Sequence, residues 1–289
     1  MTPDQARSVI AQLKSLSVEL DSAMLSSETA FLKACKVAQE HLYAKMTDLL
    51  AQSSDALLDD AMAWYSENAM ALEGIVNGSG YYPAARAYLD GYDELAKITQ
   101  GMMKKAGFDP SFATIPKEYI KFIKAHDWRH FSFLNDEALQ KLEDTLLETM
   151  LAGRTRGAML AELKGVFTGS YPWGDKKGLY EWHAGTYART AHHRAAQSFI
   201  LSQADAAGVE NFIYIGPNDS KTRGFCAELV GGVYSRKEIE AMDNGQTGNV
   251  LTDRGGFNCR HQWLPASDEL AAAIRKDITA SEINTISPA

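Results

Sequence analysis

Apolar residues in the N-terminal part of the chain recur every three or four positions. Thr2-Pro3-Asp4 is a helix-start signal, and behind it one apolar stripe runs through most of the first 75 residues. The spacing predicts either one very long helix or two consecutive helices, with a possible interruption at Ser26-Ser27-Glu28. Asn77-Gly78-Ser79-Gly80 supplies the stop. We therefore expect a helical arm or hairpin over residues 1–80.

The same helical spacing continues through a second region, residues 81–210. Glycines close several of its helices, and Asn135-Asp136 is expected to cap one of them. His192-His193-Arg194 falls in the middle of the last helix, where we expect a surface or interface position. The predicted segments are a helix over 81–106, a helix over 135–151, a helix ending at Phe167, a plain loop over 169–174, and a helix over 176–207.

Helical spacing of apolar residues ends only after residue 210, where short strand signals begin. Phe212 to Ile215 is a short strand signal, and Ser235 with Glu238 has the spacing of a capping box. We expect a short helix over 222–229 and an extended segment over 257–263 that Pro265 stops. The predicted fold is mainly α with a small α+β C-terminal module at 211–265, followed by a short helix and tail at 266–289.

Composition narrows the class of protein. The chain has 289 residues, 45% of them hydrophobic, and a formal net charge of −8, which argues against a surface that coats nucleic acid throughout. Three cysteines make no disulfide framework, which favours a reducing compartment. We expect no signal peptide, and no run of apolar residues is long enough to predict a membrane span.

One local basic band stands out against this acidic background. Between residues 97 and 129, basic residues outnumber acidic ones and alternate with aromatic side chains. Such a band is typical of a DNA-contacting surface, although core aromatics beside solvated lysines give the same pattern. The candidate DNA contacts are Lys104, Lys105, Lys117, Lys121 and Lys124.

A set of metal-ligand residue types gathers in the 211–265 module. Cys259 and His261 are two apart, so on a strand their side chains point to the same side, and a small fold can bring Cys226 beside them. Two thiolates and an imidazole suit zinc, with Asp219, a remote histidine or water as the fourth ligand. The alternatives are a reduced cysteine pair packed in a core, or a Cys226–Cys259 disulfide formed outside the cell.

The same residues also supply a superficial Cys–His–Asp nucleophile set. We expect strand geometry to keep the Cys259 thiol and the His261 ring from forming a lateral pair, and Cys226 to lie within a helix away from its start. An enzyme is therefore not expected.

The ordered elements of this module resemble the phage head-morphogenesis, Mu F-like minor head protein family. The resemblance covers about residues 140–266 and includes a lead-in helix with Arg189-Thr190. The family often has His where Cys226 stands and Cys where His261 stands, and an exchange of this kind is what a metal tolerates and a disulfide does not. The residues that carry the pattern, beside Asp219, Cys226, Cys259 and His261, are Thr222, Arg223, Gly231, Gly256, Asn258, Arg260 and Trp263.

The resemblance implies a virion component. It suggests a minor capsid protein in few copies, bound to portal, major capsid or scaffold proteins at the portal vertex inside the capsid, assembled in the host cytoplasm and acting in head morphogenesis and in DNA packaging or ejection. Zinc would be structural, and the N-terminal helices are candidates for self-association. The alternative is a phage-delivered DNA-binding or metal-dependent hydrolytic enzyme.

Overall fold

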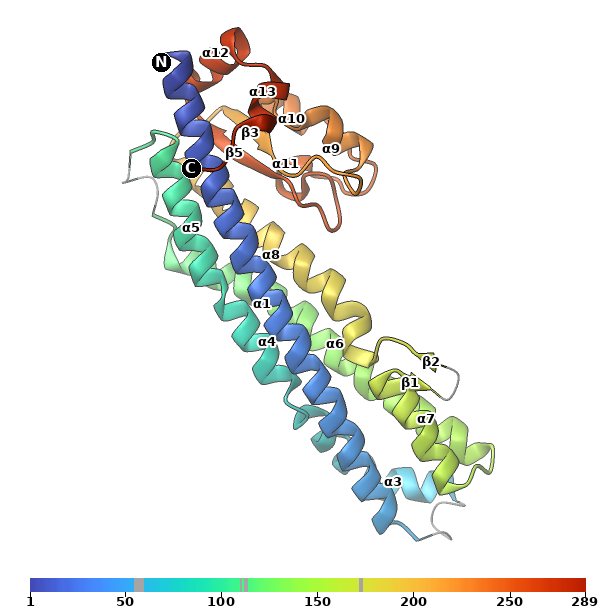
Figure 1. The fold of residues 1–289 in the computed structure, drawn as a ribbon. Helices are drawn as coiled ribbons and strands as arrows, with labels where there is room; N and C mark the ends of the chain where they lie inside the picture. The colour runs from blue at the N-terminus through green and yellow to red at the C-terminus, as the bar shows by residue number, and fades with distance from the viewer. Residues whose placement is uncertain (55–59, 110, 112–113, 172–173) are drawn as a thin grey trace. The chain divides into compact units, whose positions relative to one another are not determined.

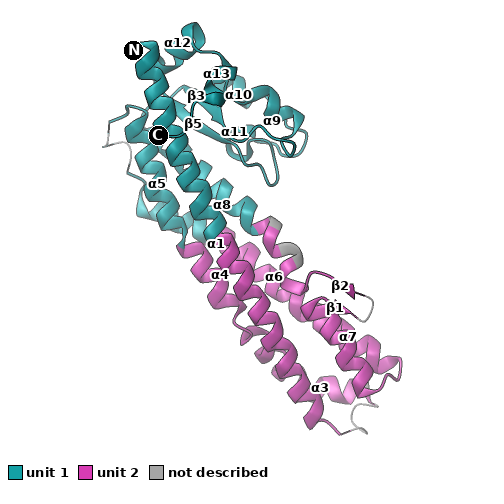
Figure 2. Cartoon of the chain, viewed as in Figure 1, with its two compact units in different colours: residues 1–26, 91–124, 188–289 teal, residues 27–90, 125–187 magenta. Residues whose placement is uncertain are grey.

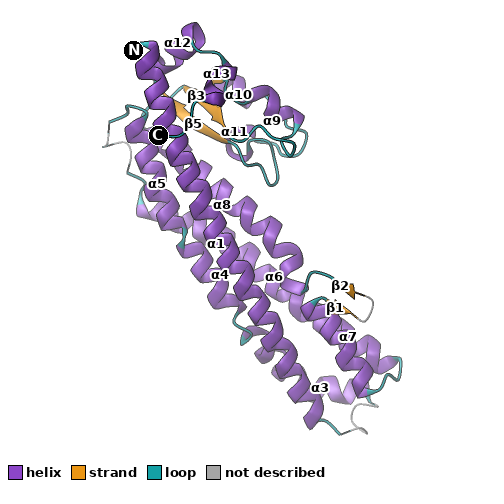
Figure 3. Cartoon of the chain, in the orientation of Figure 1, coloured by secondary structure: helices purple, strands orange, loops and turns teal. Residues whose placement is uncertain are grey.

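A computed structural model of the protein describes residues 1–54, 60–109, 111, 114–171 and 174–289. The chain is mainly α with one small antiparallel sheet near the C-terminus, which confirms the expected fold class (Figures 1 and 3). The helices are α1 (Pro3–Gln52), α3 (Ala61–Asn77), α4 (Tyr81–Asp90), α5 (Tyr92–Lys105), α6 (Lys117–Leu151), α7 (Arg156–Thr168), α8 (Leu179–Ala206), α9 (Gly224–Leu229), α10 (Arg236–Glu240), α11 (Val250–Asp253), α12 (Asp268–Asp277) and α13 (Ala280–Thr285). The strands are β1 (Ser170–Tyr171), β2 (Gly174–Asp175), β3 (Asn211–Ile215), β4 (Val233–Ser235) and β5 (Gln262–Ala266).

The chain forms two compact units, coloured separately in Figure 2. Unit 1 contains residues 1–26, 91–124 and 188–289, and unit 2 contains residues 27–90 and 125–187. Each unit therefore combines segments that are distant in sequence. Whether any of the ranges 1–80, 81–210, 211–265 and 266–289 folds by itself stays a prediction.

Unit 1 is built on a three-stranded antiparallel sheet in the order β4-β3-β5. All five residues of the central strand β3 are buried, and so are all five of the edge strand β5. Their inner side chains join a hydrophobic core that also takes in Met103 of α5 and Leu201 of α8. The sheet module thus shares its core with the long helices of its unit, and it does not have to build one from its own residues alone.

Pro265 lies inside β5, opposite Phe212 of β3, and does not end the extended segment as expected. Proline has no N–H to give to a ladder, so it is tolerated on an edge strand where that position faces away from the neighbour. Hydrogen-bonding pairs alternate along an antiparallel ladder, so Trp263, two residues earlier, also turns its N–H and C=O away from β3. These groups bond the side chain of Gln197 on α8: the Trp263 N–H donates to Oε1 at 3.1 Å, and Nε2 donates to the Trp263 carbonyl at 3.2 Å.

Unit 2 is helical apart from the short β1–β2 pair. Its core holds a cluster of aromatic rings, in which Tyr81 and Tyr180 stack at 4.4 Å and Phe31 meets Phe131 edge-on at 5.3 Å. Cys35 is fully buried on the apolar stripe of α1, and burial raises the pKa of its thiol to about 12. A cysteine of this kind packs as a small apolar residue.

Several predicted helix boundaries are wrong for identifiable reasons. Asn135 does not cap a helix: α6 runs through it, and its buried amide bonds Asn77 and Tyr180 instead. The predicted helix over 81–106 is divided at Gly91 into α4 and α5. The expected loop over 169–174 contains β1 and the first residue of β2, which pairs with it, while Pro172 and Trp173 lie outside the described residues.

The predicted surface position of the histidine pair in α8 is also wrong. His192 and His193 are both buried, at 1% and 7% exposure, and do not lie at the surface. Burial lowers the pKa of His193 to about 3, so the ring is neutral at ordinary pH. Helical periodicity alone did not show that this helix is covered on more than one face.

Candidate metal centre

Three of the predicted ligands meet in unit 1. The Cys226 and Cys259 sulfurs lie 3.9 Å apart, and the Cys259 sulfur lies 3.7 Å from Nδ1 of His261. All three ligand atoms lie within 4.8 Å of one another and all three residues are buried. Within the described part of the chain this is the one group of histidine, cysteine and acidic side chains with a metal-binding arrangement. The free thiols form no disulfide.

The ligands come from three separate pieces of chain. Cys226 lies in the first turn of α9, so its expected position away from the helix start is wrong; Cys259 lies in the loop after α11, and His261 directly precedes β5. The expectation that Cys259 and His261 share a strand is therefore wrong, since β5 begins only at Gln262. The loop brings their side chains together all the same, so the expected separation of thiol and imidazole is wrong as well.

A tight turn, residues 254–258, fixes the Cys259 sulfur. Arg254, Gly256 and Asn258 all have positive φ angles, of 55°, 87° and 57°. The Gly255 N–H donates to the Cys259 sulfur at 3.3 Å, and a Cβ at Gly255 would lie 2.3 Å from the Cys226 sulfur. Only glycine fits between the two sulfurs, because a methyl group there would overlap the thiol.

Arg223 joins α9 to this turn. Its guanidinium donates to the Gly255 carbonyl at 2.5 Å and to the Phe257 carbonyl. Thr222, the preceding residue, donates its hydroxyl to the Pro217 carbonyl at 2.9 Å. Gly231, after α9, has a φ of 86° and gives its N–H to the Tyr214 carbonyl at 2.8 Å. These motif residues hold the backbone segments that carry the ligands.

Asp219 is not brought into the cluster. Its two carboxylate oxygens accept from the Arg260 guanidinium at 2.6 and 2.8 Å, and one of them also accepts the Lys221 N–H. The Arg260 hydrogen bonds, with that N–H, hold the pKa of the Asp219 carboxyl well below its usual range. The carboxylate is thus committed to a bidentate ion pair, which explains why it is not a fourth ligand here.

Tyr214 of β3 lies directly over the cluster. Its ring stacks on His261 at 5.1 Å and packs on Trp263 at 4.2 Å, and its hydroxyl lies 3.4 and 3.5 Å from the Cys226 and Cys259 sulfurs. Trp263 is fully buried and donates its indole N–H to the Val250 carbonyl at 3.0 Å. A buried hydroxyl aimed at two sulfurs is a suitable outer-shell donor to metal-bound thiolates.

The two thiols shift each other's pKa. The hydrogen bond between the sulfurs, with that of His261 and the charge of Arg254, lowers the pKa of the Cys259 thiol. The same hydrogen bond raises the pKa of Cys226. A metal binds the deprotonated form of a cysteine, so a lowered pKa favours binding.

Two charged residues of this region had no sequence signal. Arg254 looks like a loop cation but is 2% exposed, and its guanidinium donates to the His193 carbonyl. Asp21 of α1 accepts the Gln262 amide at 3.1 Å, and burial raises the pKa of its carboxyl to about 7. Asp21 lies far in sequence from the motif, and Arg254 bonds a backbone group 61 residues away, so only the fold shows these contacts.

Two of the three distances between the ligand atoms fit a tetrahedral zinc ion, and the third pair, the Cys226 sulfur and the His261 nitrogen, lies within 4.8 Å. With zinc–sulfur bonds of about 2.3 Å and zinc–nitrogen bonds of about 2.05 Å, a tetrahedron places two sulfurs about 3.8 Å apart and sulfur and nitrogen about 3.6 Å apart. The distances of 3.9 Å between sulfurs and 3.7 Å between sulfur and nitrogen match both edges. A Cys₂His donor set is also one that zinc prefers over hard cations.

The candidate DNA contacts lie at the end of α5 and the start of α6, both within unit 1. Lys104, Lys105 and Lys117 are exposed. Lys121 pairs with Glu118 at 2.8 Å, and Lys124 pairs with Asp93 at 2.9 Å. Of the interleaved aromatics, Phe122 is exposed while Phe112 lies outside the described residues.

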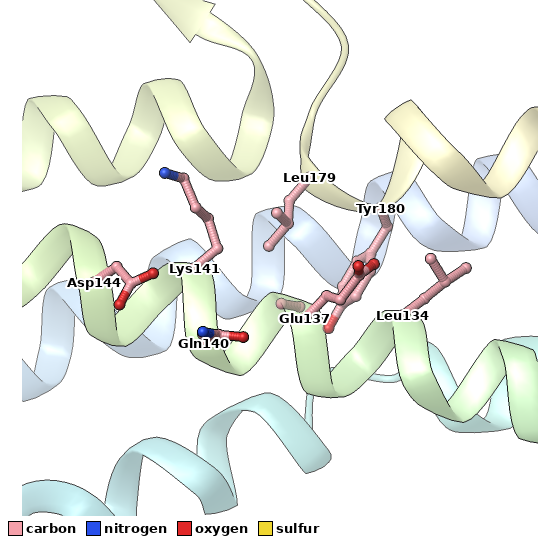
Figure 4. Close-up of a pocket in the computed structure, with 8 residues that line it drawn as sticks. Leu134, Glu137, Gln140, Lys141, Asp144, Leu179 and Tyr180 are labelled. Carbon is pink, nitrogen blue, oxygen red and sulfur yellow. The ribbon is translucent and has the colours of Figure 1, made fainter.

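A separate hollow lies on unit 2 (Figure 4), between α6 and the start of α8. Its volume is about 290 Å³, and Leu134, Leu179 and Tyr180 contribute apolar surface beside charged side chains such as Glu137 and Lys141. Its charges are of both signs and come mostly from one helix face, so they indicate no particular ligand.

Among the helices that the structure describes, none combines the length and apolar character needed to cross a membrane. In comparisons with protein-family models, curated proteins and solved structures, no match is found, so the resemblance to the phage family depends on the motif residues alone.

Proposed function

We propose that this chain is a structural minor head protein of a tailed phage that acts in head morphogenesis at the portal vertex. In this role it binds portal protein and the major capsid or scaffold proteins, and it serves DNA packaging or ejection. Its place is the capsid interior, after assembly in the host cytoplasm.

The observation that carries this proposal is how the motif residues are used. Arg223 binds the turn that holds Cys259, Arg260 holds Asp219, and Trp263 is buried against Tyr214. Each is committed to a contact inside the module. Residues that stabilise the module fit a structural protein with the family's fold, and the role itself rests on the resemblance, because a fold alone does not assign a function.

Exposed lysines give weaker support for contact with packaged DNA. Lys104, Lys105 and Lys117 offer cations near one another in sequence on two helices of unit 1. Contacts of this type would bind phosphates without reading sequence, which suits DNA that is packaged whatever its sequence.

Complementation tests the proposal. A phage with a nonsense codon in this gene is supplied with the wild-type chain, with Cys259→Ala, or with Cys35→Ala as the matched control for a buried thiol outside the cluster. We expect purified particles to contain the wild-type and Cys35→Ala chains in a few copies, associated with portal protein, and to lack Cys259→Ala. Absence of the wild-type chain from purified particles contradicts the proposal.

We further propose that Cys226, Cys259 and His261 hold one structural zinc ion. Support comes from two distances that match tetrahedral edges and from the burial of all three ligand residues. Metal analysis of the purified full chain should give about one zinc per chain. The content should fall in Cys226→Ala and His261→Gln and be unchanged in Cys35→Ala, whereas a zinc-free, folded wild-type chain contradicts the assignment.

A competing function is a metal-dependent or thiol-dependent hydrolase delivered to the host. The close approach of Cys259 to His261 is the observation that favours it. The Cys259 sulfur belongs to a residue only 4% exposed, which a substrate would have to reach. Hydrolytic activity that is present in the wild-type chain and lost in Cys259→Ala would support the enzyme and overturn the structural role.

A further inference from the structure

A small cavity borders the three ligand residues. Its volume is about 40 Å³, and its wall includes Cys226, Cys259 and His261 together with Asn258 and Lys221. Lys221 is exposed, so the cavity reaches the protein surface on that side. One water-sized molecule needs roughly 10–15 Å³ of such space. The cavity therefore has room for a metal ion's outer ligand beside the three protein ligands.

The protein supplies three ligands and zinc takes four. No further histidine, cysteine or acidic side chain of the described residues joins the group, and Asp219 is held by Arg260. Structural zinc sites fill all four positions from the protein, whereas three protein ligands leave one position for a small molecule.

Asn258 supplies the second, independent observation. Its side-chain oxygen is buried and has no hydrogen-bond partner, although the residue lines the cavity. Its φ of 57° is a conformation that asparagine tolerates and most residues do not. A buried acceptor without a donor in the protein is satisfied when a water donates to it, and the cavity has room for one.

We propose that the fourth zinc position is exchangeable and is occupied by an oxygen ligand from solvent, a water that donates to the Asn258 side-chain oxygen or a small inorganic anion. This inference depends on the zinc site proposed above. Lys221 and Arg223 on the cavity wall favour an anion, because no acidic side chain lines the same cavity among the described residues. The zinc ion then joins three segments of the chain and also keeps one position for an exchangeable ligand.

Cobalt substitution of the full chain tests this. Cobalt(II) in place of zinc gives sulfur-to-cobalt charge-transfer absorption in the near ultraviolet, which reports the metal site, and visible bands that report its coordination. Thiocyanate is the probe for the fourth position. We expect the visible bands to shift with saturation as thiocyanate is added while the charge-transfer absorption remains.

Asn258→Gly sharpens the test, because glycine keeps the positive φ and removes only the amide. The bound water then loses its acceptor, so thiocyanate displaces it more easily, and the apparent dissociation constant should fall about fivefold. Asn218→Gly, an exposed loop asparagine away from the cavity, should behave as wild type.

The outcomes separate the two proposals. Charge-transfer absorption with visible bands that thiocyanate does not change means four protein ligands, and overturns the exchangeable position while leaving the zinc site intact. Absence of charge-transfer absorption overturns the zinc site itself, and with it this inference. A thiocyanate response that is identical in wild type and Asn258→Gly overturns the role of Asn258.

Discussion

Replacing Gln197 by Leu should remove an outer hydrogen-bonding partner from the edge of the sheet. Gln197 is 1% exposed, and its amide takes both backbone groups of Trp263 that face away from β3. Leucine has nearly the same volume but neither donates nor accepts. The change therefore leaves one buried N–H and one buried C=O without partners and opens little cavity.

The magnitude follows from these two groups. An unsatisfied buried backbone group costs about 1–3 kcal/mol, so the pair predicts a loss of about 2–4 kcal/mol once partial entry of water is allowed. A loss of 2 kcal/mol corresponds to about a 30-fold rise in the opening of the strand, since every 1.4 kcal/mol is tenfold. Gln197→Glu should lose less than Gln197→Leu at low pH, because a protonated carboxyl again both accepts and donates.

Amide hydrogen exchange measured by peptide is the suitable assay, since it separates unit 1 from unit 2 within one chain. We expect faster exchange in peptides covering 211–215 and 262–266, with α3 and α7 unchanged. Gln12→Leu is the matched control, as Gln12 is half-buried on α1 and makes only a 3.5 Å contact with Ser8. Equal exchange in the two variants would show that the Gln197 amide does not support the edge of β5.

Four further predictions concern other parts of unit 1. Gly255→Ala places a Cβ 2.3 Å from the Cys226 sulfur and should cost about 1–3 kcal/mol in urea unfolding and lower the zinc content, whereas Gly248→Ala, with open space around it, should do neither. The depressed pKa of His193 means that the unfolded chain takes up a proton below about pH 6.5 that the folded chain does not take up until about pH 3. The free energy of unfolding therefore decreases as the pH is lowered through this range, by up to about 1.4 kcal/mol per pH unit. Urea midpoints should show a flatter pH profile in His193→Leu. Lys14→Met removes an ammonium that donates to three carbonyls at the end of α13, so exchange of the 280–286 amides should rise by an amount equivalent to about 1–2 kcal/mol. Chelation of zinc should raise exchange over 254–261 and leave the aromatic core of unit 2 unchanged; global unfolding on chelation would contradict this.

Local chemistry made some of the helix ends predictable. Thr2 and Gln5 cap each other's backbone at the start of α1, and the Ser235–Glu238 capping box is present as expected. Gly107 and Gly153 end their helices with positive φ angles. In each case the partners lie within a few residues, so the sequence contains the whole interaction.

Residues whose partners are distant in sequence were the ones that could not be placed. Asn135 next to an aspartate has the composition of a cap, yet Tyr180 and Asn77 satisfy it in the middle of α6. Gln197 and Arg254 carry no local pattern at all, because each bonds a backbone group more than 60 residues away. The cluster itself was predictable from residue types, while the exclusion of Asp219 depended on Arg260 being its partner.

The shared core changes what a metal would contribute to the module. A small loop-rich region with little core would depend on its metal for most of its folding free energy. Here Trp263, Phe212 and Tyr214 are fully buried in a core that α5 and α8 also enter. Arg223 and the turn around Gly255 position the sulfurs through bonds that need no metal. A site that is organised before the metal arrives loses less entropy when the metal binds. The free energy of metal binding is then available for ligand affinity and not for folding. This favours a centre that binds a ligand over one that only holds the chain together.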